Sequence, residues 1–262
     1  MRRLPRQSWL AIVAALLCLA APAAQADHTV GIVLMHGMQG SPYRIVDGLA
    51  AALTEAGYLL ERPEMCWSKS RIYDRAYEDC LREVDDAVAK LRADGATAII
   101  VAGMSLGGNA ALAYGASRNG LQGVIALAPA HDPEVVGQLP WPSAAVAKAQ
   151  AMIADGHGDE RTVFADVNGG PTAVEATPQI YLSFVGSQSP GKIPVNTAHL
   201  KAPLLWVAGT RDPTQNGGPD YAFAKAPPNP MNRYVTVSSD HLGTPDAARA
   251  AVLAWLRDLL GG

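Results

Sequence analysis

A serine flanked by glycines stands near the middle of the chain, where Gly103, Ser105 and Gly107 give the pattern G-x-S-x-G. An apolar run over 98–103 precedes it and a helix-like stretch over 106–117 follows. Such a strand-to-helix turn lifts the hydroxyl clear of the backbone, admits only small neighbours, and aims a helix N-terminus at developing negative charge. A chance pentapeptide in a chain with 25 glycines is the alternative. We predict that Ser105 is a nucleophile that attacks a carbonyl carbon.

A serine hydroxyl needs a neighbouring base to become nucleophilic. Of the six histidines, His241 follows the last apolar run, 234–238, and precedes the last helix-like stretch. The base of G-x-S-x-G enzymes occupies this place, after the acid in chain order. We therefore predict His241 as the base. His36 comes before the serine and is interpreted as a residue that braces a loop.

An acid that orients the base must follow another strand to the same edge of the sheet. Asp212 comes shortly after the buried run at 204–208 and is our choice. Asp132, after the run at 123–128, is the alternative. Asp240 adjoins the histidine, and neighbouring side chains on extended backbone point to opposite sides. A proline follows both Asp212 and Asp132, so a turn-forming role is the competing interpretation of each.

Two backbone amides are expected to stabilise the oxyanion of the reaction. One is the amide of Leu106, directly after the serine. The other comes from the loop after the first strand, which begins with the pair His36 and Gly37 and presents the amide of Met38. The sequence therefore predicts an oxyanion hole made by Met38 and Leu106.

The first 26 residues have the pattern of a secretory signal peptide: three arginines, an apolar run, then small residues ending at Ala26. The run is shorter than the roughly 20 residues of a membrane span, so no stable membrane anchor is expected. The mature chain, 27–262, then carries 18 basic and 24 acidic side chains, a formal net charge of −6. This acidic balance disfavours a nucleic-acid partner. We expect a periplasmic or secreted protein.

Apolar runs alternate with amphipathic stretches along the mature chain. This pattern predicts an α/β fold, a mostly parallel sheet with helices on both faces. Strands are expected at 30–35, 58–62, 98–103, 123–128, 204–208 and 234–238. Apolar spacing predicts helices over 45–56 and 72–91, and a last helix with Thr244 as its N-cap and Pro245 in its first turn.

Residues 131–200 interrupt this alternation with many prolines and glycines, and we interpret them as a cap-like excursion within one domain, 27–262. The excursion should contain helices, one of them at 143–154. Its aromatic side chains indicate either an apolar acyl-binding surface or, the favoured interpretation, packing within the cap. These side chains are Trp141, Phe164, Tyr181 and Phe184.

Cys66 and Cys80 are the cysteines left after signal-peptide removal. An oxidising compartment makes a disulfide between them plausible. Cys80 also lies on the apolar stripe of a predicted helix, where a buried free thiol is equally acceptable. Both interpretations stay open.

These motifs together resemble the α/β-hydrolase superfamily over nearly the whole mature chain: the His36-Gly37 pair, the serine turn, Asp212 and His241. The loop His-Gly-Met-Gln-Gly-Ser-Pro is similar to that of bacterial monoacylglycerol lipases and related esterases. The resemblance implies an α/β-hydrolase fold and a serine hydrolase that cleaves carboxylic esters through an acyl-enzyme on Ser105. It also implies a small-molecule ester substrate, acyl lipids among the candidates, and no cofactor.

Other functions use the same residues. An amidase, a thioesterase or an acyltransferase would employ the same triad, and an exported binding protein could keep the fold without turnover. A metal centre is not expected, because the histidines are dispersed and no Cys-x-x-Cys or His-Glu-x-x-His spacing occurs.

Overall fold

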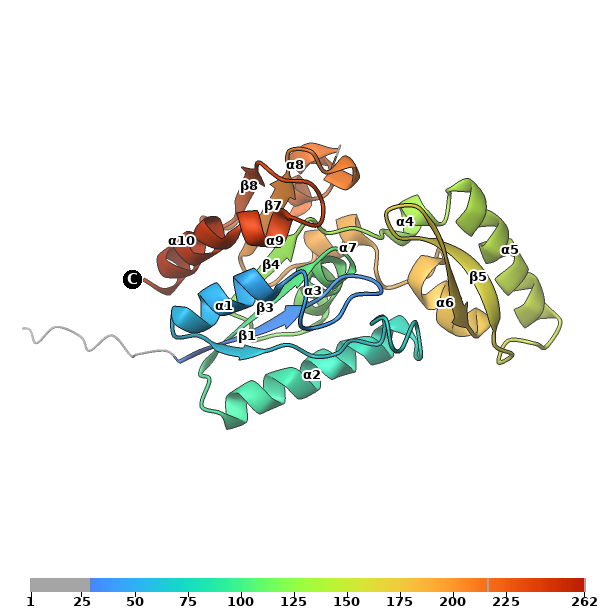
Figure 1. Ribbon diagram of the computed structural model, residues 1–262, viewed down its shortest axis with the longest axis horizontal. Coiled ribbons are helices and arrows are strands. Elements are labelled where there is room, and N and C mark those ends of the chain that lie inside the picture. Colours follow the sequence, from blue (N-terminus) through green and yellow to red (C-terminus); the bar gives the residue numbers. More distant parts are fainter. Residues whose placement is uncertain (1–28, 216, 262) are drawn as a thin grey trace, which may run out of the picture.

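The computed structural model describes residues 29–215 and 217–261 (Figure 1). The predicted signal peptide, 1–26, lies outside these residues. Within them, six strands form one parallel sheet in the order β2-β1-β3-β4-β7-β8. The strands are β1 (Val30–Met35), β2 (Leu59–Glu61), β3 (Ala98–Met104), β4 (Gly123–Leu127), β7 (Leu204–Gly209) and β8 (Arg233–Val237). The predicted mostly parallel sheet of about six strands is confirmed.

Helices cover both faces of the sheet, and β1 shows how. Ile32 and Leu34 point into a core shared with one group of helices, whereas Val33 and Met35 point into a core on the opposite face. The first group is α1 (Asp47–Glu55), α9 (Thr244–Ala247) and α10 (Arg249–Leu260). The second is α2 (Tyr77–Ala93), α3 (Leu106–Ser117) and α7 (Ile193–Ala198). Burial on both faces explains why the four central strands are almost continuously apolar, whereas the edge strands β2 and β8 are only partly buried.

Two predicted helices begin later than expected. α1 begins at Asp47, and Ile45 lies outside it with 40% of its surface exposed. α2 begins at Tyr77, so the prediction that the helix extends back to residue 72 is wrong. Ile72 and Tyr73 have φ angles of 39° and 55°, in the left-handed region that no right-handed helix contains. The helical spacing of apolar residues continues across this turn, so the spacing alone did not indicate where the helix begins.

The last helix is divided into α9 and α10 at Ala248. Gly243 is the N-cap of α9, with Thr244 and Pro245 in the first turn, so the prediction of Thr244 as N-cap is wrong by one residue. The Thr244 hydroxyl instead donates 2.7 Å to the carbonyl of Asp240. Among the described residues, no helix is long and apolar enough to cross a membrane.

Residues 133–185, called the cap below, lie at one end of the molecule, away from the C-terminus (Figure 1). The cap contains α4 (Pro133–Val136), α5 (Pro140–Ala154), β5 (Thr162–Val167), β6 (Pro171–Ala176) and α6 (Pro178–Val185). The expected helix at 143–154 is present and begins three residues earlier. Strands β5 and β6 form an antiparallel hairpin that the sequence analysis did not predict. Helix α7 follows the cap and packs on α3.

The cap aromatic residues mostly pack on one another and on the body of the protein. Phe164 stacks on Tyr181 with ring centroids 4.5 Å apart, and Phe184 stacks on Tyr73 at 3.8 Å. Trp141 differs, because 52% of its surface is exposed. The buried aromatic side chains therefore form the core of the cap and its contact with the body.

Candidate active site

The predicted site residues come from loops that leave one edge of the sheet. Ser105 directly follows β3, Met38 follows β1, Asp212 follows β7 and His241 follows β8. Because all of these strands are parallel, their carboxyl ends meet at the same edge, where ligands of open α/β sheets bind. The topology thus brings together segments that lie far apart in the sequence.

Ser105 occupies a strained turn between β3 and α3. Its φ and ψ angles are 57° and −120°, a conformation that non-glycine residues rarely adopt. Its amide donates to Leu127 at 3.0 Å, and its carbonyl accepts from Asn109 at 3.0 Å. A Cβ atom on Gly103 would overlap the backbone of Gly107, so the turn needs a glycine there. Packing and hydrogen bonds hold the serine in the unfavourable conformation.

The side chains of Ser105, His241 and Asp212 form a hydrogen-bonded row. His241 Nε2 lies 2.9 Å from Ser105 Oγ, and His241 Nδ1 lies 2.7 Å from Asp212 Oδ2. A carboxylate only accepts, so Nδ1 carries the proton and Nε2 presents its lone pair to the serine hydroxyl. This arrangement can remove the proton of the hydroxyl as its oxygen attacks an electrophile.

Asp212 is buried and receives further hydrogen bonds. Thr214 donates to Asp212 Oδ1 from its amide at 2.9 Å and from its hydroxyl at 2.8 Å. Burial raises the pKa of Asp212, but the hydrogen bonds from His241 and Thr214 outweigh it and hold the pKa below its ordinary value. The carboxylate is therefore ionised at neutral pH. Thr214 was not among the predicted site residues, although Asp-Pro-Thr is a turn pattern in which an aspartate accepts from the second residue after it.

Asp132, the alternative acid, has other partners. Its Oδ1 caps α4 by accepting from the Glu134 amide at 2.8 Å. Its Oδ2 accepts from the Ile193 amide at 3.0 Å and from the Tyr221 hydroxyl at 2.7 Å. Asp132 therefore ties the entry of the cap to α7 and to the chain beyond it.

The loop after β1 lies against the serine turn. A Cβ atom on Gly37 would stand 3.1 Å from the Cβ of Ser105, and one on Gly107 would meet the His36 carbonyl at 2.6 Å. The amides of Met38 and Leu106 donate to no protein acceptor among the residues that the structure describes. Two free amides next to the serine suit the role predicted for them, holding an oxyanion.

His36 braces this loop through both ring nitrogens. Nε2 accepts from the Met65 amide at 3.2 Å, so Nδ1 carries the proton and donates to the Gly37 carbonyl at 2.8 Å. The same carbonyl accepts from the Gly40 amide at 3.0 Å. It belongs to the peptide whose N–H is the amide of Met38, and polarising a carbonyl strengthens the N–H of its peptide as a donor.

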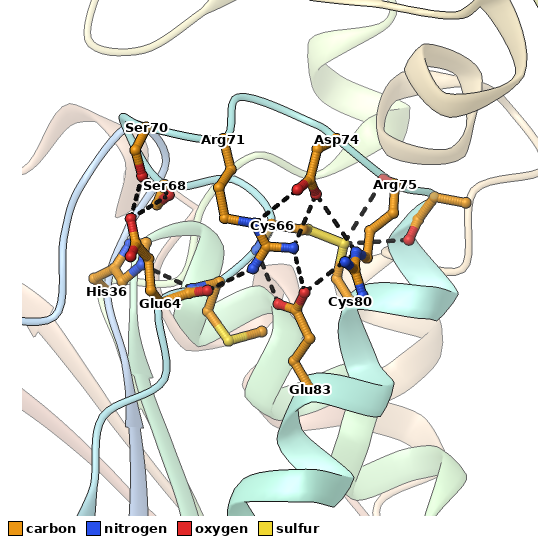
Figure 2. Close-up of polar contacts among 12 residues, drawn as sticks. His36, Glu64, Cys66, Ser68, Ser70, Arg71, Asp74, Arg75, Cys80 and Glu83 are labelled. Atoms are coloured by element: carbon orange, nitrogen blue, oxygen red, sulfur yellow. Dashed lines mark hydrogen bonds and ion pairs between the residues drawn. A yellow bond between two sulfur atoms is a disulfide. The ribbon is translucent and has the colours of Figure 1, made fainter.

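Cys66 and Cys80 form a disulfide that ties the segment before α2 to that helix, with Cα atoms 5.7 Å apart. Figure 2 shows this segment, in which Arg71 contacts both Asp74 at 2.8 Å and Glu83 at 2.6 Å. The segment also reaches the loop after β1, because Trp67 Nε1 donates to the His36 carbonyl at 2.9 Å. The disulfide thus holds a segment that contacts the loop after β1, in which Met38 is the predicted oxyanion donor.

A second buried polar cluster, which was not predicted from the sequence, joins the cap to the body. Asp166 of β5 accepts from His131 Nε2 at 2.8 Å and from the Tyr73 hydroxyl at 3.0 Å. Burial lowers the pKa of His131, but the carboxylate of Asp166 outweighs it, and the pKa is raised. Isolated polar residues in a loop and a strand carry no motif, so no sequence signal marked them. No group of three or more His, Cys, Asp or Glu that could hold a metal occurs in the described part of the chain.

The comparison with family models decides the family. The model of the alpha/beta hydrolase family matches residues 32–259, nearly all of the described chain. The chain belongs to this family. The resemblance drawn from the motifs is therefore confirmed, and so is the α/β-hydrolase fold.

Several solved structures share the fold of this chain at low sequence identity. Est1E from Butyrivibrio proteoclasticus is 18% identical with a TM-score of 0.65, over 90% of each chain. The monoacylglycerol lipase of Paleococcus ferrophilus is 18% identical with a TM-score of 0.65, over 87% of this chain and 94% of that one. A structure from the study of the metagenome-derived lipolytic enzymes LipS and LipT is 17% identical with a TM-score of 0.60, over 89% and 94%. No curated protein sequence matches this hydrolase significantly.

Proposed function

We propose that this alpha/beta hydrolase cleaves carboxylic esters through an acyl-enzyme on Ser105. The observation that carries the proposal is the row from Ser105 Oγ through His241 to Asp212, with distances of 2.9 and 2.7 Å. The solved structures above are at most 18% identical to this chain, so their similarity supports the fold alone. The proposed chemistry therefore rests on the geometry of these three residues.

In the proposed mechanism, His241 Nε2 takes the hydroxyl proton as Ser105 Oγ bonds to the ester carbonyl carbon. The amides of Met38 and Leu106 hold the oxyanion that forms. His241 then gives the proton to the departing alkoxide, which leaves as the alcohol. Water then attacks the acyl carbon with His241 as base, and the bond between Ser105 Oγ and the acyl carbon breaks as His241 returns the proton to Oγ, which releases the acid. Asp212 fixes the tautomer of the imidazole throughout.

The experiment replaces Ser105 in the purified full-length protein. Ser105→Ala should abolish hydrolysis of p-nitrophenyl acetate and butyrate, and labelling by a fluorophosphonate probe, while the circular dichroism spectrum stays unchanged. Ser117→Ala is the matched control, because Ser117 ends the same helix and its hydroxyl contacts Ala113, Tyr114 and Arg118, which are all close to it in the chain. If the wild-type protein is neither labelled nor active, the result contradicts the proposed hydrolase and favours the binding-protein alternative. Turnover retained in Ser105→Ala would remove Ser105 from the mechanism.

The substrate class is proposed as a small-molecule ester, acyl lipids included. Est1E has been solved with ferulic acid bound, which shows that the fold accommodates aromatic acids in that protein. A screen of p-nitrophenyl esters of increasing chain length, with amide and thioester analogues at matched acyl groups, distinguishes an esterase from an amidase or thioesterase. Faster turnover of the amide or thioester would replace the ester proposal.

We also propose that the protein is exported to the periplasm or secreted, with cleavage after Ala26. The disulfide between Cys66 and Cys80 supports export, because such bonds persist in oxidising compartments. Mass spectrometry of the protein recovered outside the cytoplasm should give a chain that begins at Asp27. Recovery of the intact chain from the cytoplasm alone would contradict export.

A further inference from the structure

The turn of the cap hairpin contacts the loop after β1, residues 36–40, which presents the Met38 amide and is called the oxyanion loop here. Asn168 stands between β5 and β6, and its Nδ2 donates to the carbonyl oxygen of Met38 at 3.3 Å. On the same hairpin, Thr172 Oγ1 accepts from Gln39 Nε2 at 3.3 Å. We propose that Asn168, through its contact with Met38, is a positioning residue that the cap supplies to the oxyanion hole. This inference rests on the proposed function and names a residue outside the triad.

The contact reaches the peptide between Met38 and Gln39, which is held from two sides. Its carbonyl accepts from Asn168, and its N–H, on Gln39, donates to the Trp67 carbonyl at 2.8 Å. The peptide plane sets the direction of the adjacent Met38 amide, because only the φ and ψ rotations at Met38 separate the two peptides. Fixing both ends of the plane therefore restricts where the Met38 N–H points.

The loop needs such restraint because Gln39 has a φ of 52°. A non-glycine residue in this region is strained and relaxes unless its surroundings hold it. Relaxation at Gln39 would turn the neighbouring peptide and move the Met38 amide away from the serine. Asn168 and Trp67, one from the cap and one from the disulfide-linked segment, oppose that rotation.

The hairpin itself is firmly attached to the body, so Asn168 has a defined position. Asp166, two residues earlier in the chain, is fully buried and binds both His131 and Tyr73. The Tyr73 hydroxyl also lies 3.7 Å from Met38 Sδ. A buried carboxylate with these partners is costly to move, because its charge would lose them in an apolar interior. The placement of the cap and the geometry of the oxyanion loop are thereby coupled.

The test compares Asn168→Ala and Asn168→Asp with Thr172→Val in the full-length protein. Asn168 Nδ2 also lies 3.5 Å from Gln39 Oε1. Thr172→Val removes the hydrogen bond from the Gln39 side chain to Thr172 but leaves both Asn168 contacts, so it is the matched control. Removing a whole oxyanion donor costs roughly 10² to 10³ in turnover, and misorienting one should cost about 10-fold. We expect Asn168→Ala to lower kcat on p-nitrophenyl butyrate about 10-fold with KM within about twofold. Asn168→Asp, whose carboxylate cannot donate at pH 8, should lose at least as much.

Phenylboronic acid forms a tetrahedral adduct with the serine, so the affinity of Asn168→Ala for it should fall in parallel with kcat. The melting temperature of this variant should stay unchanged, because only a general loss of cap structure would lower it. Thr172→Val should stay within about twofold in kcat. Turnover of Asn168→Ala within about twofold of wild type, or an equal loss in Thr172→Val, overturns the inference and leaves the proposed function standing.

A wild-type protein without turnover would defeat the proposed function instead. Amide hydrogen exchange then decides the positioning role on its own. Faster exchange of the Gln39 amide, which is bonded to the Trp67 carbonyl, in Asn168→Ala than in Thr172→Val supports it, and equal rates overturn it.

Discussion

The imidazole of His36 accepts a hydrogen bond from the amide of Met65 across two loops, at an Nε2-to-N distance of 3.2 Å. The amide can only donate, so the bond requires a neutral ring with its proton on Nδ1. That proton is donated to the Gly37 carbonyl at 2.8 Å, beside the Met38 amide. A protonated ring would lose the Met65 bond and disturb the loop that carries the predicted oxyanion donor.

This bond gives the protein a predictable pH dependence. Burial lowers the pKa of His36 below its ordinary value of 6.5, so the unfolded chain takes up the proton more readily than the folded one. The stabilising contribution is complete above about pH 6.5 and is lost as the pH falls from there toward the folded-state pKa. Urea unfolding of wild type and His36→Asn between pH 8 and 5 should show a wild-type advantage that shrinks with acid. A constant difference over that range would contradict it.

The disulfide should contribute to stability by closing a loop of about 15 residues that ends in the first turn of α2, since its cysteines are 14 positions apart. Loop closure of this size stabilises by roughly 3 kcal/mol in the chain-entropy account. The double variant Cys66→Ser with Cys80→Ser should unfold at lower urea concentration by about that free energy. Reductant should lower the stability of wild type and leave the double variant unchanged. Equal midpoints for the oxidised protein and the variant would exclude the contribution.

Asp212 and Asp132 should differ sharply when each is replaced. Asp212→Asn keeps the shape of the site but favours the wrong imidazole tautomer, so kcat should fall on the order of 10⁴-fold. Asp132→Asn should keep turnover within about threefold and lower the melting temperature, because a buried acceptor of three hydrogen bonds is weakened. Ester hydrolysis and thermal unfolding of both variants provide the measurement. The reverse pattern of turnover would assign the acid to Asp132.

Gly103 should tolerate no larger residue. A Cβ there would overlap the backbone of Gly107, so Gly103→Ala must displace either β3 or α3 and with it Ser105. We expect loss of fluorophosphonate labelling together with lower soluble yield. Gly170→Ala is the control, because nothing lies within 4 Å of the added atom. Full labelling of Gly103→Ala would show that the turn adjusts more easily than its packing indicates.

The sequence alone determined the elements that position the site. The four central strands are buried on both faces and therefore continuously apolar, and shorter apolar runs marked the partly buried edge strands β2 and β8. The G-x-S-x-G turn marked where β3 ends and α3 begins. Chain order then selected Asp212 and His241, because parallel strands deliver their carboxyl ends to one edge. These inferences needed only local composition and topology.

Only the tertiary structure decided what depends on long-range contacts. Asp212 and not Asp132 proved to be the hydrogen-bond partner of His241, Cys66 proved to be bonded to Cys80, and Thr214 was found to donate to Asp212. The left-handed turn at Ile72 and the cap hairpin were not recognised in the sequence, although their own backbone hydrogen bonds are local. The contacts of Tyr73 with Asp166 and of Asn168 with Met38 join residues that are distant in sequence. Hydrogen bonds between such partners depend on three-dimensional proximity, which residue spacing along a chain does not encode.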